Sequence, residues 1–188
     1  MKHYILYSLF TLLTTIVLLQ SCNYQPNKSN LNSDTLLTKT ITFPHELYEL
    51  DKNQFLKIDC FIDDSKYKTK IISIVDGNCM KCIINQLNKV DDLFNSIMNK
   101  EAMLVFVLNV SKEDSAFFMR HIRPAIETTG VILWDNNYHF ERQNQLFTKN
   151  LNLRTFMINK QNMIIQYGNP VMNPYIIKAY KEKLNKTH

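Results

Sequence analysis

The sequence predicts an α/β fold with a central mixed sheet and helices on both of its faces. Short apolar runs, typical of buried strands, alternate along the chain with segments that have the 3.6-residue period of amphipathic helices. Strands that alternate with helices pair in parallel, and the connecting helices then cover both faces of the sheet. Near the carboxyl terminus, two apolar runs flank the turn-like residues 159–162, which predicts an antiparallel hairpin.

Six segments have the character of strands. Residues 54–62 alternate apolar and polar side chains, as a half-buried strand does. Residues 70–75 and 103–108 are continuous apolar runs, which are typical of central strands covered on both faces. The remaining strands are expected at residues 131–134, 153–158 and 163–167.

Four helices are expected between or after these strands. The clearest one follows the second strand and has apolar residues at helical spacing, namely Ile83, Leu87, Val90, Phe94 and Ile97. The others are expected from the N-cap Ser111 to Pro124, at residues 140–149, and after the Asn173-Pro174 pair.

Length and composition indicate one folded domain. The chain has 188 residues, enough to bury a sizeable core without a dense set of disulfides. Its 22 basic and 17 acidic residues give a net charge of +5 without a dense basic run, so no nucleic acid partner is expected. The four cysteines, Cys22, Cys60, Cys79 and Cys82, are too scattered for a disulfide-stapled scaffold, so each needs its own explanation.

The first residues have the organisation of a secretory signal. Lys2 and His3 precede a short apolar run that ends at Leu19-Gln20-Ser21-Cys22, a sequence that resembles the lipobox of bacterial lipoproteins. We therefore expect residues 1–21 to be a lipoprotein signal peptide and Cys22 to carry the lipid that anchors the protein to a membrane.

The segment after the cysteine predicts a spacer. Residues 23–40 are rich in Asn, Ser, Thr, Lys and Gln and show no apolar period, so we expect the lipidated cysteine and a flexible tether at residues 22–42 and the folded domain at residues 43–188. No acidic cluster follows Cys22. Such a cluster would resemble the surface-export signal of Bacteroidetes lipoproteins, so we expect a location in the cell envelope that faces the periplasm.

The chemistry is expected at Cys79-Met80-Lys81-Cys82. Two cysteines three positions apart at the start of a helix can form a disulfide, and the free N–H groups and helix dipole there stabilise a thiolate. Cys79 is the candidate nucleophile and Cys82 the resolving cysteine, while Lys81 adds positive charge nearby. The motif follows a buried strand and opens an amphipathic helix, which is the context of a redox pair.

This arrangement resembles the thioredoxin-like superfamily, in particular the TlpA/ResA-like branch and the lipid-anchored thioredoxin-domain proteins of Bacteroidetes. The resemblance covers about residues 54–184 and also rests on Thr155-Phe156-Met157-Ile158-Asn159, which is similar to the family's Thr-Phe-x-Ile-Asp strand. It implies a thioredoxin fold and thiol–disulfide exchange with exported proteins, served by an upstream redox donor. No cofactor and no metal are expected.

Two positions depart from the family pattern. Arg154 stands where the family has a cis-proline facing the cysteines, and no proline lies between Pro124 and Pro170. We expect Arg154 to lie near the pair, where its charge would stabilise a thiolate. Asn78 replaces a frequent tryptophan, and Met80-Lys81 replaces Gly-Pro as the dipeptide that tunes the reduction potential.

Other functions remain open for the same residues. The pair could be a structural disulfide on a redox-inactive binding module. It could also handle copper as Sco-like proteins do, with His121 or His139 as a third ligand. Cys60 lies in an apolar strand context and is expected to be a core residue.

Overall fold

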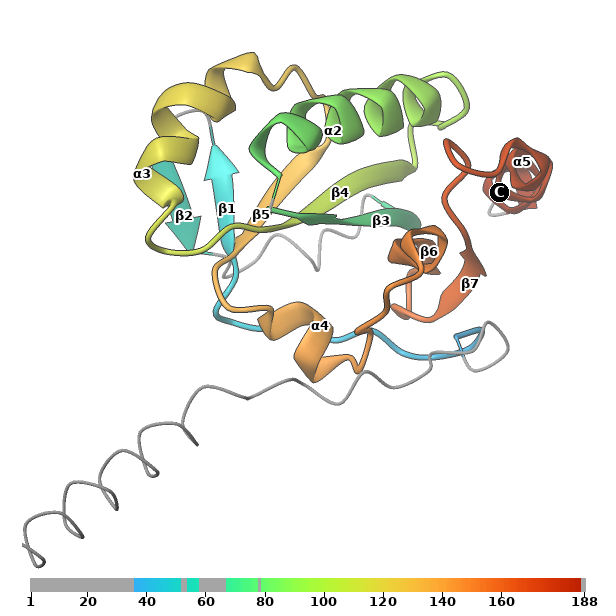
Figure 1. Cartoon of the computed structure of the whole chain (residues 1–188). Helices are drawn as coiled ribbons and strands as arrows, with labels where there is room; N and C mark the ends of the chain where they lie inside the picture. Colours follow the sequence, from blue (N-terminus) through green and yellow to red (C-terminus); the bar gives the residue numbers. More distant parts are fainter. Residues whose placement is uncertain (1–35, 52–53, 58–66, 78, 187–188) are drawn as a thin grey trace, which may run out of the picture.

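The computed structural model describes residues 36–51, 54–57, 67–77 and 79–186. These residues form a seven-stranded mixed sheet with helices on both faces (Figure 1), which confirms the predicted fold class. The strand order is β2-β1-β5-β4-β3-β6-β7. The strands are β1 (Tyr48–Asp51), β2 (Gln54–Lys57), β3 (Thr69–Asp76), β4 (Ala102–Asn109), β5 (Val131–Asp135), β6 (Thr155–Asn159) and β7 (Ile164–Tyr167).

The central strands β3, β4 and β5 run parallel to one another. Every residue of β4 is buried, and β3 is buried up to its last residue, which explains why their sequences do not alternate. The predicted hairpin of β6 and β7 is present, and it pairs antiparallel with β3. The sequence did not predict β1, because only Leu50 of its four residues is buried and no pattern can develop.

The helices differ in how well they match the prediction. They are α2 (Met80–Asn95), α3 (Ser115–Phe117), α4 (His139–Gln143) and α5 (Ile177–Lys186). The helix expected from Ser111 to Pro124 consists of α3, the π-helical turn η3 (Phe118–Ile122) and the 3₁₀ turn η4 (Arg123–Ala125). The hydroxyl of Ser111 accepts a hydrogen bond from the backbone N–H of Asp114, so it caps the turn that leads into α3.

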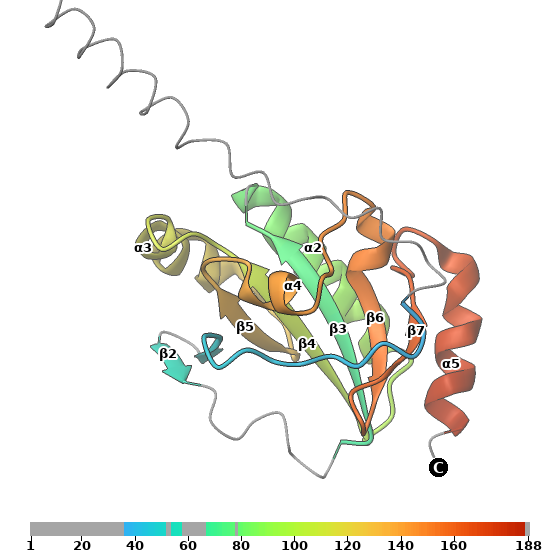
Figure 2. The ribbon, with the colours of Figure 1, turned by 90° about the horizontal axis from the view of Figure 1, so that it is seen from below.

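The two faces of the sheet have separate apolar cores. On one face, the apolar side of α2 packs with Tyr180 of α5 against the odd-numbered residues of β3 and the even-numbered residues of β4 (Figure 1). On the opposite face, Phe140 of α4 packs with Leu36, Ile41 and Leu47 from the segment that precedes β1 (Figure 2). This second face is thus covered largely by extended chain, because α4 is only five residues long.

The folded part of the chain begins earlier than the sequence predicted. Residues 36–42 were assigned to the tether, but Leu36 and Ile41 are fully or almost fully buried, and Thr40 forms a bridge with Met163. These apolar residues are separated by polar ones without a regular period, so the sequence pattern did not reveal them. No helix in the described part of the chain is long and apolar enough to span a membrane. Residues 1–21, which are predicted to be a signal peptide, lie outside the described residues, as do Cys22 and Cys60.

The helix expected at residues 140–149 is also shorter than predicted. It ends at Gln143, and the following Asn144 donates hydrogen bonds from its side chain to the carbonyl oxygens of Phe140 and Thr42. Gln145 then has a positive φ of 51°, which breaks the helical path. The contact with Thr42 is long-range, which is why local sequence pattern missed this helix end.

A buried carboxylate on α2 fixes the loop that leads into β5. Asp91 is 3% exposed, and its Oδ1 accepts hydrogen bonds from the backbone N–H groups of Thr129 and Gly130, each at 3.1 Å. The hydroxyl of Thr128 and the side-chain amide of Asn95 also donate to this carboxylate. Asp91 therefore joins α2 to the start of a central strand.

Replacing Asp91 with alanine is expected to lower the free energy of unfolding by about 2–4 kcal/mol, because several buried donors lose their acceptor. The measurement is urea unfolding with the disulfide intact. The matched control is Asp92→Ala, since Asp92 is the neighbouring exposed acid and its removal should change stability by less than about 0.5 kcal/mol. Equal effects of the two substitutions would contradict the role assigned to Asp91.

Candidate functional site

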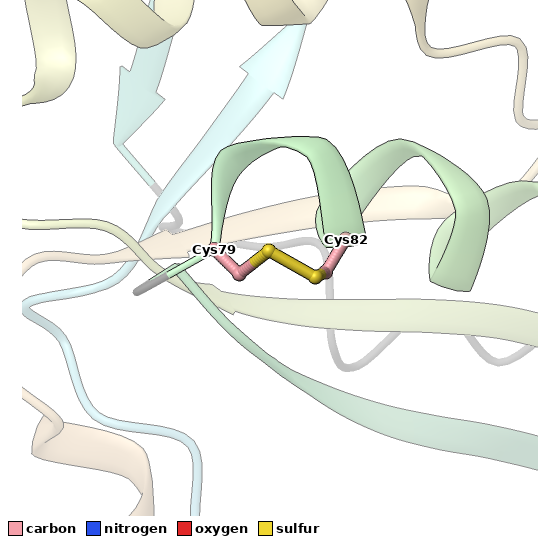
Figure 3. The surroundings of a disulfide bond; sticks show 2 residues. All are labelled: Cys79 and Cys82. Atoms are coloured by element: carbon pink, nitrogen blue, oxygen red, sulfur yellow. A yellow bond between two sulfur atoms is a disulfide. The ribbon is translucent and has the colours of Figure 1, made fainter.

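The two cysteines of the motif form a disulfide at the start of α2. The Cys79–Cys82 bond has an S–S distance of 2.08 Å and a Cα–Cα distance of 5.1 Å (Figure 3). Cys79 is the N-cap of α2, and both cysteines are exposed. Both sulfur-bearing residues are therefore accessible from solvent.

The turn between β3 and α2 is shaped by a close backbone contact. The N–H of Gly77 donates to the carbonyl oxygen of Asn109 at 2.7 Å, and a side-chain carbon at residue 77 would collide with that same oxygen. Only glycine fits there. The turn that carries Cys79 is therefore held against the end of the neighbouring strand β4.

The start of α2 favours a thiolate. The carbonyl oxygen of Cys79 accepts hydrogen bonds from the N–H groups of Cys82 at 2.9 Å and Ile83 at 3.1 Å, so the helix begins at this cysteine. No acidic side chain lies in the first turn. Within this first turn no carboxylate opposes the free N–H groups and the positive end of the helix dipole, which would stabilise a thiolate at Cys79. The side chain of Lys81 lies outside the described part of the structure.

Arg154 occupies the predicted place directly before β6, at the end of the 3₁₀ turn η5 (Leu151–Arg154). Its Nη2 donates to Oε1 of Glu141 at 3.1 Å, and its Nη1 lies 3.6 Å from Oδ2 of Asp76. The side chain is 10% exposed, so the guanidinium is almost entirely enclosed. The described residues contain no cis peptide bond. Arg154 therefore directs its charge towards two carboxylates, one of which ends the strand that leads to Cys79.

Glu141 is the buried partner in this cluster. It is fully buried on α4, and its Oε2 accepts a hydrogen bond of 2.6 Å from the side-chain amide of Asn109. Burial raises the pKa of Glu141 to about 6, while Arg154 and Asn109 lower it and the nearby Asp76 and Asp135 raise it further. Because the pKa of Glu141 is higher in the folded than in the unfolded protein, ionisation of this group disfavours folding. The contribution of Glu141 to the free energy of unfolding is therefore largest below pH 4.5 and declines as the pH rises through 6.

Glu141 and Asn109 were not predicted from the sequence to have a role in the site. A usable signal was present, because Asp76, Asn109 and Asp135 each follow directly on a buried apolar strand. The carboxyl ends of parallel strands lie at one edge of a sheet, which is where functional groups gather in α/β folds. Glu141 itself could not be found this way, since only the packing of α4 brings it to that edge.

The histidines considered as copper ligands have other contacts in the structure. The ring of His121 packs against the ring of Phe117, with centroids 4.8 Å apart. The backbone N–H of His139 donates to Asp135. Among the described residues, no group of three or more histidine, cysteine, aspartate or glutamate side chains is arranged to hold a metal ion.

Sequence comparison finds no matching family model and no matching curated protein. Similarity appears at the level of structure. A thioredoxin-like protein solved in its oxidised form matches with a TM-score of 0.54 and 14% identity, over 81% of this chain and 99% of that one. A thioredoxin-like protein from Porphyromonas gingivalis matches with a TM-score of 0.53 and 14% identity, over 80% and 96% of the two chains.

A third match is a candidate thiol-disulfide oxidoreductase from Bacteroides vulgatus, with a TM-score of 0.51 and 16% identity over 77% of this chain and 91% of that one. At these identities the matches establish the fold alone. Each match nevertheless covers nearly all of the solved protein, so the similarity concerns a whole domain. The chain has a thioredoxin-like fold, with a CxxC disulfide at the start of α2.

Proposed function

We propose that this protein is a thiol-disulfide oxidoreductase that acts on protein cysteines through Cys79 and Cys82. The observation that supports the proposal best is the exposed disulfide at the first turn of α2, on a thioredoxin-like fold. A partner sulfur can reach either cysteine without displacing the core. The helix start stabilises the thiolate that must leave or attack during exchange.

In the reducing direction, the Cys79 thiolate attacks one sulfur of a substrate disulfide. A new S–S bond joins Cys79 to that sulfur, the substrate bond breaks, and the other substrate sulfur leaves as a thiolate that takes a proton. The Cys82 thiolate then attacks Cys79, which restores the Cys79–Cys82 bond and releases the second substrate sulfur. Two electrons and two protons pass from the pair to the substrate, and a separate dithiol donor reduces the pair again. In the oxidising direction the same steps run in reverse.

We assign the attacking role to Cys79 because it is the N-cap. The thiolate of an N-cap residue lies at the positive end of the dipole, whereas Cys82 lies within the first turn. The disulfide requires no further group, so the proposed exchange uses no cofactor.

The proposed location follows from the amino-terminal sequence. Residues 1–21 are proposed to direct export, and Cys22 is proposed to carry a lipid that holds the domain at a membrane of the cell envelope, facing the periplasm. An oxidising compartment of this kind allows a disulfide to persist. The substrates would then be exported proteins with cysteines.

The full chain is expected to accelerate insulin reduction by dithiothreitol, measured as turbidity. Cys79→Ser should lower the rate to the uncatalysed background, because the attacking sulfur is lost. Cys82→Ser should accumulate a mixed disulfide with insulin that non-reducing electrophoresis detects, because no resolving sulfur remains.

The matched control is Cys60→Ser, which removes a cysteine outside the motif and should keep the wild-type rate. Wild-type protein that does not exceed the background would instead favour the alternative function, a binding module in which the disulfide is structural.

Lipidation has its own test in a bacterial host. The wild-type chain should incorporate labelled palmitate and sediment with membranes, whereas Cys22→Ser should lose the label, because the acceptor thiol is absent. Cys79→Ser serves as the control and should keep the label. Labelling that persists in Cys22→Ser would exclude this cysteine as the lipid attachment site.

A further inference from the structure

Polar residues form a continuous row at the carboxyl edge of the parallel strands. Asp76 ends β3, Asn109 ends β4 and Asp135 ends β5. The pairing register places Asp76 beside Asn109 and Asn109 beside Asp135. Each residue lies two positions after an apolar residue of the core that α4 covers, so all three side chains face that side of the sheet.

The turn that carries Cys79 is attached to this row in two ways. Its backbone is held by the hydrogen bond from the N–H of Gly77 to the carbonyl oxygen of Asn109. Its side-chain attachment is the ion pair between Asp76 and Arg154. The side chain of Asn109 donates to Glu141, which also accepts from Arg154. Both attachments of the turn therefore lead to the same buried carboxylate.

Arg154 has two acidic partners, and it binds them through different nitrogens at different distances. The separation is 3.1 Å for Glu141 and 3.6 Å for Asp76, so Glu141 holds the guanidinium more closely. Asp135, the third acid near Glu141, accepts hydrogen bonds from the backbone N–H groups of Asn137, His139 and Phe140. Asp135 thus accepts hydrogen bonds from backbone donors, whereas Glu141 and Asp76 are the two acids that pair with Arg154.

Two buried atoms in the cluster have no hydrogen-bond partner among the described residues, namely Nε of Arg154 and Oδ1 of Asn109. The amide of Asn109 now presents its N–H to Glu141. Rotation of the amide by half a turn would present Oδ1 instead, which can accept a hydrogen bond from a protonated carboxyl. The site can therefore satisfy Glu141 in either protonation state.

We propose that Arg154 is a positioning residue for the Cys79–Cys82 pair, and that protonation of Glu141 strengthens the ion pair between Arg154 and Asp76. The inference rests on the proposed function only for its biological use, since the response itself requires no protein substrate. With Glu141 ionised, Arg154 is divided between two carboxylates. With Glu141 neutral, its charge is directed to Asp76 and so to the turn before Cys79.

The groups that face Glu141 are Arg154, Asn109, Asp76 and Asp135, and the pKa of about 6 places the change between about pH 5 and 7. Above this range the three charges of Asp76, Arg154 and Glu141 sum to −1, and below it to zero. The extra negative charge opposes the thiolate that leaves when the disulfide is attacked. Reduction of the pair should therefore be slower when Glu141 is ionised.

The first experiment follows the amide signal of Gly77 by NMR. The full chain, oxidised, labelled with ¹⁵N and kept in solution by a mild detergent, is titrated from pH 4.5 to 8. The Gly77 signal should move with a midpoint near 6 in the wild type, and Glu141→Gln and Arg154→Met should lose this transition. A wild-type Gly77 signal without a transition between pH 5 and 7 would overturn the proposal, and this result does not depend on any variant folding.

The second experiment measures reduction of the disulfide by dithiothreitol in wild type and in Glu141→Gln. The quantity compared is the wild-type rate divided by the Glu141→Gln rate, because the ionisation of dithiothreitol affects both rates equally and cancels. This ratio should be near one at pH 5 and fall to about one third at pH 7.5, because the glutamine mimics the neutral acid. A ratio that stays constant over this range would overturn the coupling to the pair.

The matched control is Glu182→Gln on α5, an exposed glutamate that pairs with Lys178. Its rate ratio to the wild type should be the same at both pH values. A pH-dependent ratio in this control equal to that of Glu141→Gln would also overturn the assignment. Neither experiment uses a protein substrate. A failure of insulin reduction would therefore contradict the proposed function without changing the outcomes expected here.

Discussion

The structure depends on the parallel pairing of β3, β4 and β5 under two apolar layers. Because β4 is buried along its whole length and β3 up to its last residue, the register of these strands is strongly fixed. That register brings Asp76, Asn109 and Asp135 side by side at one edge. It also fixes where β3 ends, and so where the turn to Cys79 begins. Core packing thereby determines the geometry of the site.

The site combines an exposed disulfide with a buried ionic cluster. Both cysteines of the disulfide are exposed. The cluster of Glu141 and Arg154 needs the opposite environment, because charges interact strongly only where water is excluded. The turn through Gly77 connects the two environments over a few residues. This connection is the route by which we propose that protonation of Glu141 influences the disulfide.

Arg154 shows how a departure from a family pattern can gain meaning from its surroundings. In the sequence it was an arginine at the position of a proline, and its charge was expected to act on a thiolate. In the structure that charge is engaged by Glu141 and Asp76, which come from α4 and β3. Neither partner lies near Arg154 in the sequence, so only the packed sheet and α4 could identify them.

The sequence by itself determined the features that local pattern encodes. The continuous apolar runs of the central strands, the period of α2, the β6–β7 hairpin and the place of Cys79 and Cys82 before and within the first helical turn were all predicted correctly. Tertiary structure decided the features that depend on distant contacts. Asn144 ends the helix at Gln143 by binding Thr42, Leu36 and Ile41 cover a sheet face without a periodic pattern, and Glu141 meets Arg154. Periodicity reports which face of an element is buried, but it carries no information about which distant residue lies against that face.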